Sequence, residues 1–564
     1  MESNKKIKSN LKYGILLLLL ILTFITYKQV LNNGYVWDDN IFFQERYNIK
    51  NGILNWKTIS QTVLPNASYF RPLVFLTYII EIKIFGLNPF YMHLNNLLIH
   101  LINIILAYRL AFIFLKNSED RSHIIPLIIA SIFALHPIQV EAITWIAGRF
   151  DLLSTTFSFL TLIILTDNNN NKIQIIFGSV FFFLALLCKE TAILLIPIYL
   201  IIILFKDKNS DINDIKFKLK NKFQIIISLA ITVLIYFTLR SISLDHTLIQ
   251  SNEFNSVTNN IFNRIWYGFY IITEYILILL NPFSDIGPVH PQVKNLTNSI
   301  IWYIYPIISI SLLLLSSFIL VKKNEISSKF FIIFVIASIL FTQIFVSIFL
   351  AQNTIADRYM YFPLFFFFLA LITISYKILK TKTILLILSV YLLFSIFTIK
   401  TTLPMWQNNY TLWFWQYSKY PESFAKQEYF HELVKSNQLS LLEKEFKKLH
   451  IKKDPLKNTN SNGDFDLMIN QLYGEYLIRT NDPEAVAFLI ELVNTFPPEV
   501  IKGNNVKNII FKRAYISCLI QLSQAFYYIN NDYNNAIKTL KLAKNIGNDQ
   551  YDVVEWEKKL NNPD

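Results

Sequence analysis

The chain has 564 residues, of which 53% are hydrophobic and 16% are charged, and its mean hydropathy is +0.38. Soluble domains usually carry about 25% charged residues, so this chain has too few charges to cover a water-facing surface of its size. Its net charge is +13, but much of the excess lies in short loops between apolar segments, as the positive-inside rule predicts. The composition therefore indicates a polytopic membrane protein and argues against nucleic-acid binding. Its two cysteines exclude a disulfide framework or a cysteine-based zinc site.

The apolar segments predict an all-α membrane domain with eleven crossings. Several segments are shorter than the roughly 17 residues that a crossing needs, so they must borrow length from their flanks. The first one follows four lysines and has no small-residue cleavage site after it, so we expect a retained anchor and not a signal peptide. The predicted crossings are residues 13–30, 93–115, 123–136, 152–166, 173–188, 190–205, 223–240, 300–321, 330–350, 359–376 and 384–400.

Two further apolar stretches are expected to lie in the membrane interface without crossing it. Residues 72–85 are short and contain a Glu and a Lys, and residues 261–281 contain an Arg and a Glu before they end at an Asn-Pro pair. Amphipathic helices of this kind bury only one face in the headgroup region.

The charges on the loops predict the orientation of the chain. With the N-terminus in the cytoplasm, the inner segments hold 19 Lys and Arg residues, whereas the short outer loops hold only Arg149, Lys189 and Arg358. The positive-inside rule favours this orientation, and an odd number of crossings then places everything after residue 400 outside. Three long pieces share the outer side: the first outer loop (31–92), the loop at 241–299 and the C-terminal segment (401–564).

The sequence divides into a membrane domain (1–400) and a polar, helical C-terminal domain (401–564). In the latter, the segments starting at Gln521 and Asp532 resemble a tetratricopeptide repeat, and so do those starting at Tyr473 and Asp482 and closing at Pro497. A third, degenerate unit is predicted at 421–450. The alternative is an ordinary helical bundle.

The first candidate for chemistry is the pair of acids that follows the first crossing, Asp38 and Asp39. Adjacent carboxylates repel each other, so one of them ionises poorly unless a cation or a hydrogen-bond donor is near. Such a pair can supply a general base and a second ligand. The alternative is a solvated polar loop.

The second candidate is the outer loop between the third and fourth crossings. It contains His136, Glu141, Arg149 and Asp151 within sixteen residues, more ionisable groups than a helix connection needs. One site must hold its reacting groups together, so we expect the acid pair within about 10 Å of Asp151. Asp151 could also cap the fourth crossing, which is worth about 1 kcal/mol and is compatible with catalysis.

Isolated cations at the outer edge form the third candidate: Arg71, Lys189 beside Glu190, and Arg358 beside Tyr359. Snorkelling of these side chains to lipid headgroups is one explanation. Binding of a phosphate or diphosphate at headgroup depth is the other, because arginine forks suit phosphate oxygens. The two histidines near the outer start of the second crossing, His93 and His100, are expected to serve packing more than ligand binding.

Six motifs, in order across residues 1–400, resemble those of GT-C membrane glycosyltransferases. More narrowly, they resemble the tetratricopeptide-containing transmembrane protein O-mannosyltransferases and their bacterial relatives. The tail departs from that pattern, because its repeats are few and degenerate. The motifs are Trp37-Asp-Asp, Tyr69-Phe-Arg-Pro-Leu, His93-Leu-Asn-Asn-Leu-Leu-Ile-His, His136-Pro-Ile-Gln-Val-Glu-Ala-Ile-Thr-Trp-Ile-Ala-Gly-Arg-Phe-Asp-Leu-Leu, Cys188-Lys-Glu-Thr and Asp357-Arg-Tyr-Met-Tyr-Phe-Pro.

The resemblance implies transfer of a sugar, with a mannose-like hexose favoured, from a polyprenyl- or dolichyl-phosphate donor to a protein hydroxyl outside the cytoplasm, with inversion. It implies that Asp38 or Asp39 is the base, and that the C-terminal domain engages the protein acceptor. The further catalytic candidates are Glu141 and Asp151; the donor-phosphate candidates are Arg71, Arg149, Lys189, Arg358 and Tyr359; the accessory candidates are His93, His136 and Glu190. The sequence demands no cofactor, although a divalent cation held by Asp39, Glu141 and Asp151 stays open.

Three other functions are weighed against this one. The first keeps the chemistry but has a lipid or glycan of the envelope as acceptor, and the second is a non-catalytic scaffold with a protein-binding tail. The third, a secondary transporter, is disfavoured because the chain has only 12 glycines and its charges avoid the centres of the crossings. The expected location is the bacterial inner membrane, or the endoplasmic reticulum membrane in a eukaryote.

Overall fold

The computed structural model describes residues 2–60, 69–115, 124–166, 172–205, 212–244, 261–284, 286–290, 299–323, 325–338, 355–458, 466–496, 506–547 and 551–561. The chain forms two compact units, residues 1–249 with 254–412 and residues 250–253 with 413–564, so the division falls slightly after the expected boundary at residue 400. All regular structure among the described residues is helical, apart from an isolated bridge between His290 and Ile355, and the expected all-α class is confirmed.

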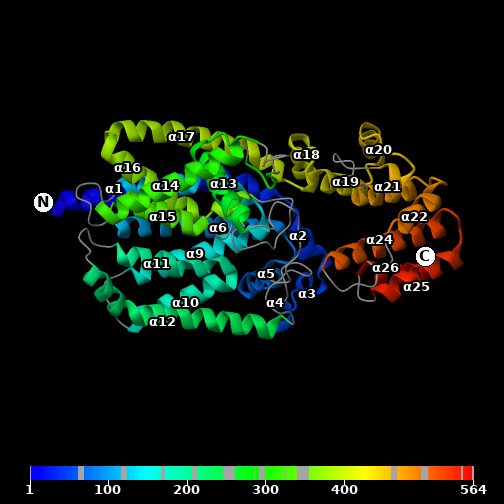
Figure 1. Ribbon diagram of the computed structural model, residues 1–564, viewed down its shortest axis with the longest axis horizontal. Coiled ribbons are helices and arrows are strands. Elements are labelled where there is room, and N and C mark those ends of the chain that lie inside the picture. The colour runs from blue at the N-terminus through cyan, green and yellow to red at the C-terminus, as the bar shows by residue number, and fades with distance from the viewer. Residues whose placement is uncertain are drawn as a thin grey trace. The chain divides into compact units, whose positions relative to one another are not determined.

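The first unit contains long apolar helices joined on one side by short helical turns. In Figure 1 the long helices of this unit run side by side. Its elements are α1 (Glu2–Tyr27), η1 (Lys28–Asn32), α2 (Asp38–Asn40), η2 (Ile41–Glu45), α3 (Tyr47–Lys50), α4 (Trp56–Ile59), α5 (Pro72–Phe85), α6 (Pro89–Leu115), α7 (Ile124–Leu135), η3 (Pro137–Gln139), α8 (Val140–Thr144), η4 (Ile146–Gly148), α9 (Arg149–Leu165), α10 (Lys172–Cys188), η5 (Glu190–Leu194), α11 (Leu195–Leu204), α12 (Ile212–Ser243), α13 (Ile261–Leu280), α14 (Ile301–Lys323), α15 (Ile326–Ser338), η8 (Asp357–Met360), α16 (Pro363–Ile378), α17 (Thr381–Thr402) and η9 (Leu403–Trp406).

Six segments of the described chain are long and apolar enough to cross a membrane. A seventh crossing results if α7 and the bent continuation through η3 and α8, at 51° to it, count as one span. The six segments are Lys12–Asn32, Pro89–Leu115, Ile146–Leu165, Lys222–Ser243, Ile301–Lys323 and Thr381–Trp406. Four more predicted crossings correspond to the shorter apolar helices α10, η5 with α11, α15 and α16, so the number eleven stays a prediction. The protein is a multi-pass membrane protein.

Helix α9 lies at the centre of the first unit. Its apolar segment is 72% buried, against 17% for α14 and 22% for α12 and α17, and it packs against both α6 and α10. The outer helices instead expose large apolar side chains, such as Leu314 and Phe318 of α14, as expected for helices that face lipid. The N-terminal part of α9, which carries Asp151, is therefore largely buried in the protein.

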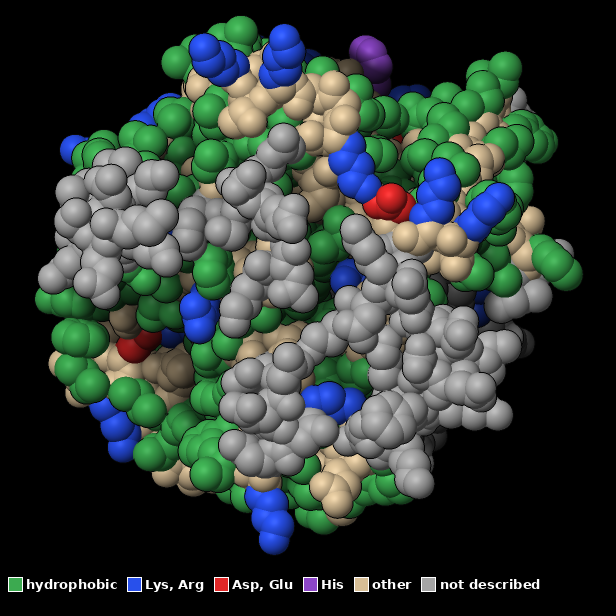
Figure 2. Space-filling view, turned by 90° about the vertical axis from the view of Figure 1, so that its left-hand side faces the viewer, with side chains coloured by type: hydrophobic (Ala, Val, Ile, Leu, Met, Phe, Trp, Pro, Cys, Tyr) green, Lys and Arg blue, Asp and Glu red, His purple; other side chains and the backbone are tan. Residues whose placement is uncertain are grey.

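The face of the molecule shown in Figure 2 bears many Lys and Arg side chains and few acids. One short turn joins α14 to α15, and another joins α16 to α17. Lysines of the described chain lie at or next to these helix ends, Lys322, Lys377 and Lys380 among them. One of these, Lys377, forms an ion pair with Glu325. Such a distribution is typical of the cytoplasmic ends of membrane helices.

The second unit is a row of helical hairpins, where the repeats were predicted. Its elements are the part of α18 (Asn409–Lys419) from residue 413, α19 (Ala425–Lys435), α20 (Leu439–Lys448), η10 (Pro455–Lys457), α21 (Leu467–Arg479), α22 (Ala485–Asn494), α24 (Val506–Tyr528), α25 (Tyr533–Ile546) and α26 (Tyr551–Asn561).

The hairpins α19–α20, α21–α22 and α24–α25 turn in the same way. After the first helix of each, an asparagine takes a positive φ (Asn437 55°, Asn481 51° and Asn531 51°), a conformation that asparagine tolerates better than most residues and that often ends helices. Close packing supports the second hairpin, because a Cβ on Gly474 of α21 would lie 2.7 Å from the Leu489 side chain of α22. Their identity as tetratricopeptide repeats stays a prediction, and Pro497 lies outside the described residues.

Candidate active site

The first outer loop holds the acid pair in a constrained conformation. Gly34 donates its N–H to the carbonyl oxygen of Gln407 (2.9 Å), and Trp37 donates its N–H to Asn409 Oδ1 (2.8 Å). Trp37 has a φ of 54°, which is rare for a bulky residue and typical of constrained functional sites. Its indole stacks on that of Trp145, with centroids 4.8 Å apart. The chain is thus fixed directly before Asp38.

The two acids have different surroundings. Asp39 is fully buried, and its carboxylate accepts the N–H groups of Ala147 (3.0 Å) and Val36 (3.3 Å). Asp38 is only partly buried, and no described residue donates a hydrogen bond to its carboxylate. Burial raises the pKa of Asp38 to about 6, against the opposing effect of the Arg358 and Arg46 charges. Burial also raises the pKa of Asp39 well above its usual value.

The loop at 136–151 packs against the first outer loop through Asp39 and Ala147, so these two outer loops are in contact; the distance from the acid pair to Asp151 stays a prediction. The loop is tightly wound, because a Cβ on Gly148 would lie 2.2 Å from the carbonyl oxygen of Ala142. Glu141, in the same loop, accepts the N–H of Arg358 (2.9 Å) and forms an ion pair with its guanidinium. The loop therefore joins Asp39 to Arg358.

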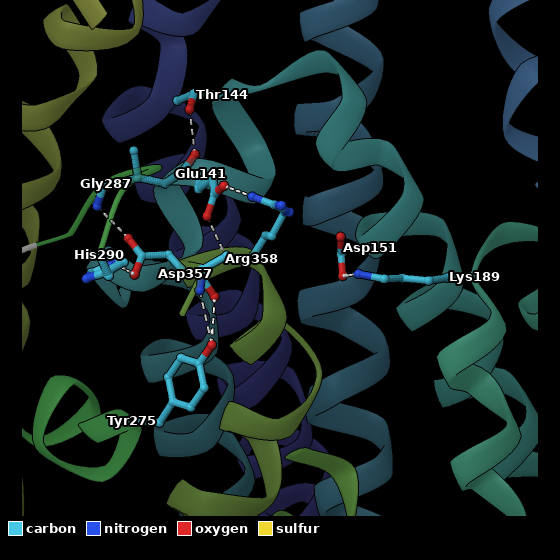
Figure 3. A network of polar contacts seen from close by, with 11 residues as sticks. Glu141, Thr144, Asp151, Lys189, Tyr275, Gly287, His290, Asp357 and Arg358 are labelled. Atoms are coloured by element: carbon cyan, nitrogen blue, oxygen red, sulfur yellow. Dashed lines mark hydrogen bonds and ion pairs between the residues drawn. The ribbon is translucent and has the colours of Figure 1, made fainter. Parts of the chain in front are cut away.

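Three outer-edge cations each pair with an acid from another part of the chain. Arg71 forms a two-pronged contact with Glu190 (2.7 and 3.1 Å), and Lys189 Nζ lies 2.5 Å from Asp151 Oδ1. Arg358 pairs with Glu141, and Figure 3 shows this pair together with the Lys189–Asp151 pair. The side chains of Arg71 and Arg358 keep 10% and 16% of their surface exposed.

Aromatic rings surround the same cations. The Arg71 guanidinium lies 4.3 Å from the ring of Tyr69, and Lys189 Nζ lies 5.1 Å from that of Tyr359. Arg358 lies 4.9 Å from the Tyr359 ring and 5.4 Å from that of Trp37. Tyr359 is therefore shared between Lys189 and Arg358, which brings two of the predicted phosphate-binding cations together.

A narrow cavity opens beside Lys189. Hydroxyl and carboxyl side chains of α9 line it, together with residues of η5, α11, α15, η8 and α16. On α9 the lining residues recur every three to four positions, the spacing of one helix face. The lining residues are Asp151, Ser154, Thr155, Ser158, Lys189, Thr191, Ala192, Leu194, Leu195, Ala337, Tyr359, Phe362 and Pro363. The cavity therefore has the charged pair Asp151 and Lys189 and several hydroxyl groups on one part of its lining, and apolar side chains on the rest.

Arg149 has a different place from the other predicted cations. It is completely buried, and its guanidinium donates to Glu81 (2.5 Å), to Asn96 Oδ1 (2.8 Å) and to the carbonyl oxygen of Met92 (2.9 Å). Its donors are therefore used within the protein, joining α5, α6 and α9. We accordingly assign Arg149 a packing role in place of the expected phosphate contact.

The histidines serve packing. His136 is buried, accepts the N–H of Ile138 at Nδ1 (3.1 Å), and lies 3.1 Å from the carbonyl oxygen of Leu279 at Nε2. His93 Nε2 lies 3.3 Å from the carbonyl oxygen of Gly34, and His100 lies 2.7 Å from the Tyr361 hydroxyl. His136 thus has protein partners at both ring nitrogens, the accessory role of His93 stays a prediction, and Glu190 lies at the site as the partner of Arg71.

A metal held by Asp39, Glu141 and Asp151 does not fit the arrangement. Each of these carboxylates already has a protein partner, namely a backbone N–H, an arginine and a lysine. Among the described residues, no three His, Cys, Asp or Glu side chains gather in a way that could hold a metal ion. Glu141 and Asp151 instead pair with Arg358 and Lys189, and Asp39 accepts backbone N–H groups.

The sequence pattern did not single out several groups around the site. Glu81 was visible only as a charge within an apolar helix, and Asp357 only as part of a motif. Nothing in the local sequence points to Tyr275 or His290, which contact the residues directly before Arg358. Arg46 lies in the first outer loop, where its charge acts on Asp38.

Comparison with known proteins finds similarity to the same family that the motifs resemble. The chain is 33% identical over 156 residues to the human protein O-mannosyl-transferase TMTC1, which covers 25% of this chain and 17% of that protein. It is 32% identical over 149 residues to human TMTC3, covering 25% and 15%. The chain is similar to protein O-mannosyltransferases.

The similarity is partial. The Caenorhabditis elegans protein O-mannosyl-transferase F38B6.6 is 27% identical over 193 residues, which covers 32% of this chain and 27% of that protein. The chain thus matches about a sixth to a quarter of the length of these relatives, and no protein-family model matches it.

Among solved structures, the chain resembles the archaeal oligosaccharyltransferase AglB from Archaeoglobus fulgidus, in complex with an inhibitory peptide and a dolichol-phosphate. The identity is 12%, and the alignment covers 75% of this chain and 59% of that one, with a TM-score of 0.39. A TM-score this low does not establish a common fold.

Proposed function

We propose that the protein transfers a mannose-like hexose from a polyprenyl- or dolichyl-phosphate donor to a hydroxyl of a protein acceptor, with inversion, on the extracytoplasmic side of the membrane. The observation that carries the proposal is the approach of two cations, Lys189 and Arg358, to the same Tyr359 ring. The charge of Arg358 also acts on Asp38, a partly buried carboxylate to which no described residue donates a hydrogen bond. The similarity to proteins named as O-mannosyltransferases supports the reaction class.

Asp38 is the proposed base. A hydroxyl is a weak nucleophile at neutral pH, and a carboxylate with a raised pKa removes its proton more readily than an ordinary one. The acceptor oxygen forms a bond to the anomeric carbon of the sugar, the proton moves to Asp38, and the bond from that carbon to the phosphate oxygen breaks. The lipid phosphate leaves with the bonding electrons. Direct displacement of this kind inverts the anomeric configuration.

The cations stabilise the leaving group. The donor is a phosphodiester with one negative charge, and the released lipid phosphate gains a second. Groups that are already oriented towards this growing charge lower the barrier. Arg71, Lys189 and Arg358 have carboxylate partners that hold their side chains in place, and the proposed phosphate lies where Tyr359 contacts two of them.

A reconstituted assay tests the proposal. The purified full-length chain in nanodiscs is incubated with dolichyl-phosphate-mannose and a library of Ser- and Thr-containing peptides, and the products are identified by mass spectrometry. We expect peptides that carry one hexose, in the anomeric configuration opposite to that of the donor, and far less product with the Asp38→Asn variant. Hexose on envelope lipids or glycans alone would favour the other acceptor class, and the absence of any transfer by the wild type would overturn the proposal.

The proposal also requires the site and the C-terminal domain to lie outside the cytoplasm. A reporter enzyme that is active only outside, fused to the end of the chain, should be active in cells, whereas one fused before α1 should not. Activity of a cytoplasm-only reporter at the C-terminal end would contradict the predicted eleven crossings.

A further inference from the structure

The residue directly before Arg358 has a partner set of its own. Asp357 is 1% exposed, and both of its carboxylate oxygens are engaged: Oδ2 accepts the N–H of Gly287 (2.7 Å), and Oδ1 lies 2.9 Å from Nε2 of His290. Residues 286–290 belong to the long loop predicted at 241–299, and His290 also bridges to Ile355. Figure 3 shows Asp357 turned towards Gly287 and His290, on the side away from the Arg358 guanidinium. Asp357 therefore anchors the backbone and does not face the donor site.

A second anchor acts on the preceding residue. The hydroxyl of Tyr275, in α13, donates to the carbonyl oxygen of Ala356 and accepts its N–H, both at 3.2 Å. Tyr275 is fully buried, so this hydroxyl cannot exchange its partners for bulk water. The Tyr275 hydroxyl thus satisfies both the backbone N–H and the backbone carbonyl oxygen of Ala356.

The turn that carries Arg358 is consequently held from three elements. Tyr275 fixes Ala356, His290 fixes Asp357, and Glu141 of α8 accepts the N–H of Arg358 itself. The first two contacts involve Ala356 and Asp357 and no atom of Arg358. A cation that binds phosphate must be held by its neighbours within about 0.5 Å of the position in which it binds. The contacts of Tyr275 and His290 can hold the backbone of Arg358 in this way.

We propose that His290 and Tyr275 are positioning residues, which orient the Arg358 guanidinium towards the donor phosphate through Asp357 and Ala356. This inference rests on the proposed function, because it assumes that Arg358 contacts the donor. It adds that the loop at 286–290 and helix α13 determine donor affinity without touching the donor. Loss of either anchor lets the turn adopt other conformations, and the phosphate must then bind a less ordered arginine.

A double-mutant cycle tests this. The dissociation constant of dolichyl phosphate is measured for the full-length chain in nanodiscs, for His290→Ala, for Arg358→Ala and for the double variant. A hydrogen bond to a charged group is worth roughly tenfold in an equilibrium constant, so we expect His290→Ala to weaken binding about tenfold in the wild-type background. In the Arg358→Ala background the same change should have almost no effect, because non-additivity of this kind identifies residues that act through each other. His290→Gln can still donate to Asp357 and should restore most of the affinity.

Two further comparisons distinguish failure of the positioning role from failure of the proposed phosphate contact. Tyr275→Phe should weaken binding like His290→Ala, whereas Tyr391→Phe, which removes another hydroxyl–carbonyl contact to α13 (2.8 Å to Leu279), should not. The positioning role is overturned if His290→Ala leaves the dissociation constant of dolichyl phosphate unchanged. It is also overturned if His290→Ala weakens binding by the same factor with and without Arg358 while the variants unfold at the wild-type temperature. If Arg358→Ala itself leaves dolichyl phosphate binding unchanged, the proposed phosphate contact of the preceding section fails instead.

Discussion

The carboxylate of Asp39 accepts the backbone N–H of Ala147 at 3.0 Å, although the two residues are 108 positions apart in the chain. This contact ties the first outer loop to the loop at 136–151. It also distinguishes the two adjacent acids: the carboxylate of Asp39 accepts backbone N–H groups, whereas no described residue donates a hydrogen bond to that of Asp38, the proposed base.

The first prediction separates these two acids. Asp38→Asn preserves shape but removes the proton acceptor, so turnover should fall by roughly 10²–10⁴-fold while the affinity for dolichyl phosphate stays near that of the wild type. Asp39→Asn keeps an amide oxygen for the Ala147 N–H and should lose far less turnover. Initial rates and donor affinity of the two purified variants decide between them. A large rate loss in Asp39→Asn alone would move the base to Asp39.

The second prediction concerns pH. A base acts in its deprotonated form, and burial raises the pKa of Asp38 to about 6, so kcat/KM should rise with pH through about 6 and stay level above it. The nearby Arg46 charge lowers this pKa. Arg46→Gln should therefore move the midpoint of the profile to higher pH. A profile that stays flat from pH 5 to 8 would contradict Asp38 as the base.

The third prediction contrasts two arginines. Arg149 is wholly buried with Glu81, and removing one partner of a buried ion pair costs about 3–5 kcal/mol, so Arg149→Ala should lower the unfolding temperature markedly. Arg71 is paired with a Glu190 side chain that is 35% exposed, so Arg71→Ala should leave the fold largely intact. It should instead weaken dolichyl phosphate binding by about 10- to 100-fold, the worth of a hydrogen bond to a charged group. The reverse assignment of the two effects would show that Arg149, and not Arg71, contacts the donor.

The fourth prediction concerns backbone packing in the loop at 136–151. A Cβ on Gly148 would lie 2.2 Å from the Ala142 carbonyl oxygen, a clash with backbone that no side-chain movement relieves. Gly148→Ala should therefore displace the neighbouring Glu141 and lower both turnover and thermal stability. Gly14→Ala is the matched control, since no atom lies within 4 Å of its added Cβ. Equal behaviour of both variants would mean that the loop tolerates the shift.

Much of the architecture was predictable because it depends on local properties of the chain. Long apolar runs predict membrane helices whatever they pack against. The predicted segments 13–30, 93–115 and 300–321 coincide closely with the apolar spans Lys12–Asn32, Pro89–Leu115 and Ile301–Lys323. Asparagines at 437, 481 and 531 mark the turns of the three predicted hairpins for the same reason, since the preference for the left-handed conformation belongs to the residue itself.

Only the tertiary structure decided which charges meet. In the sequence, Arg149 and Arg358 are both cations on short outer loops. In the structure, Arg149 donates to Glu81, Asn96 and Met92, whereas Arg358 keeps part of its surface exposed. Asp38 and Asp39 are likewise equivalent in the sequence, and in the structure only Asp39 accepts the N–H of Ala147. Ion pairs and hydrogen bonds of this kind join residues 53 to 217 positions apart. The packing of the helices brings such residues together, so neither their spacing nor their local pattern in the chain encodes the contact.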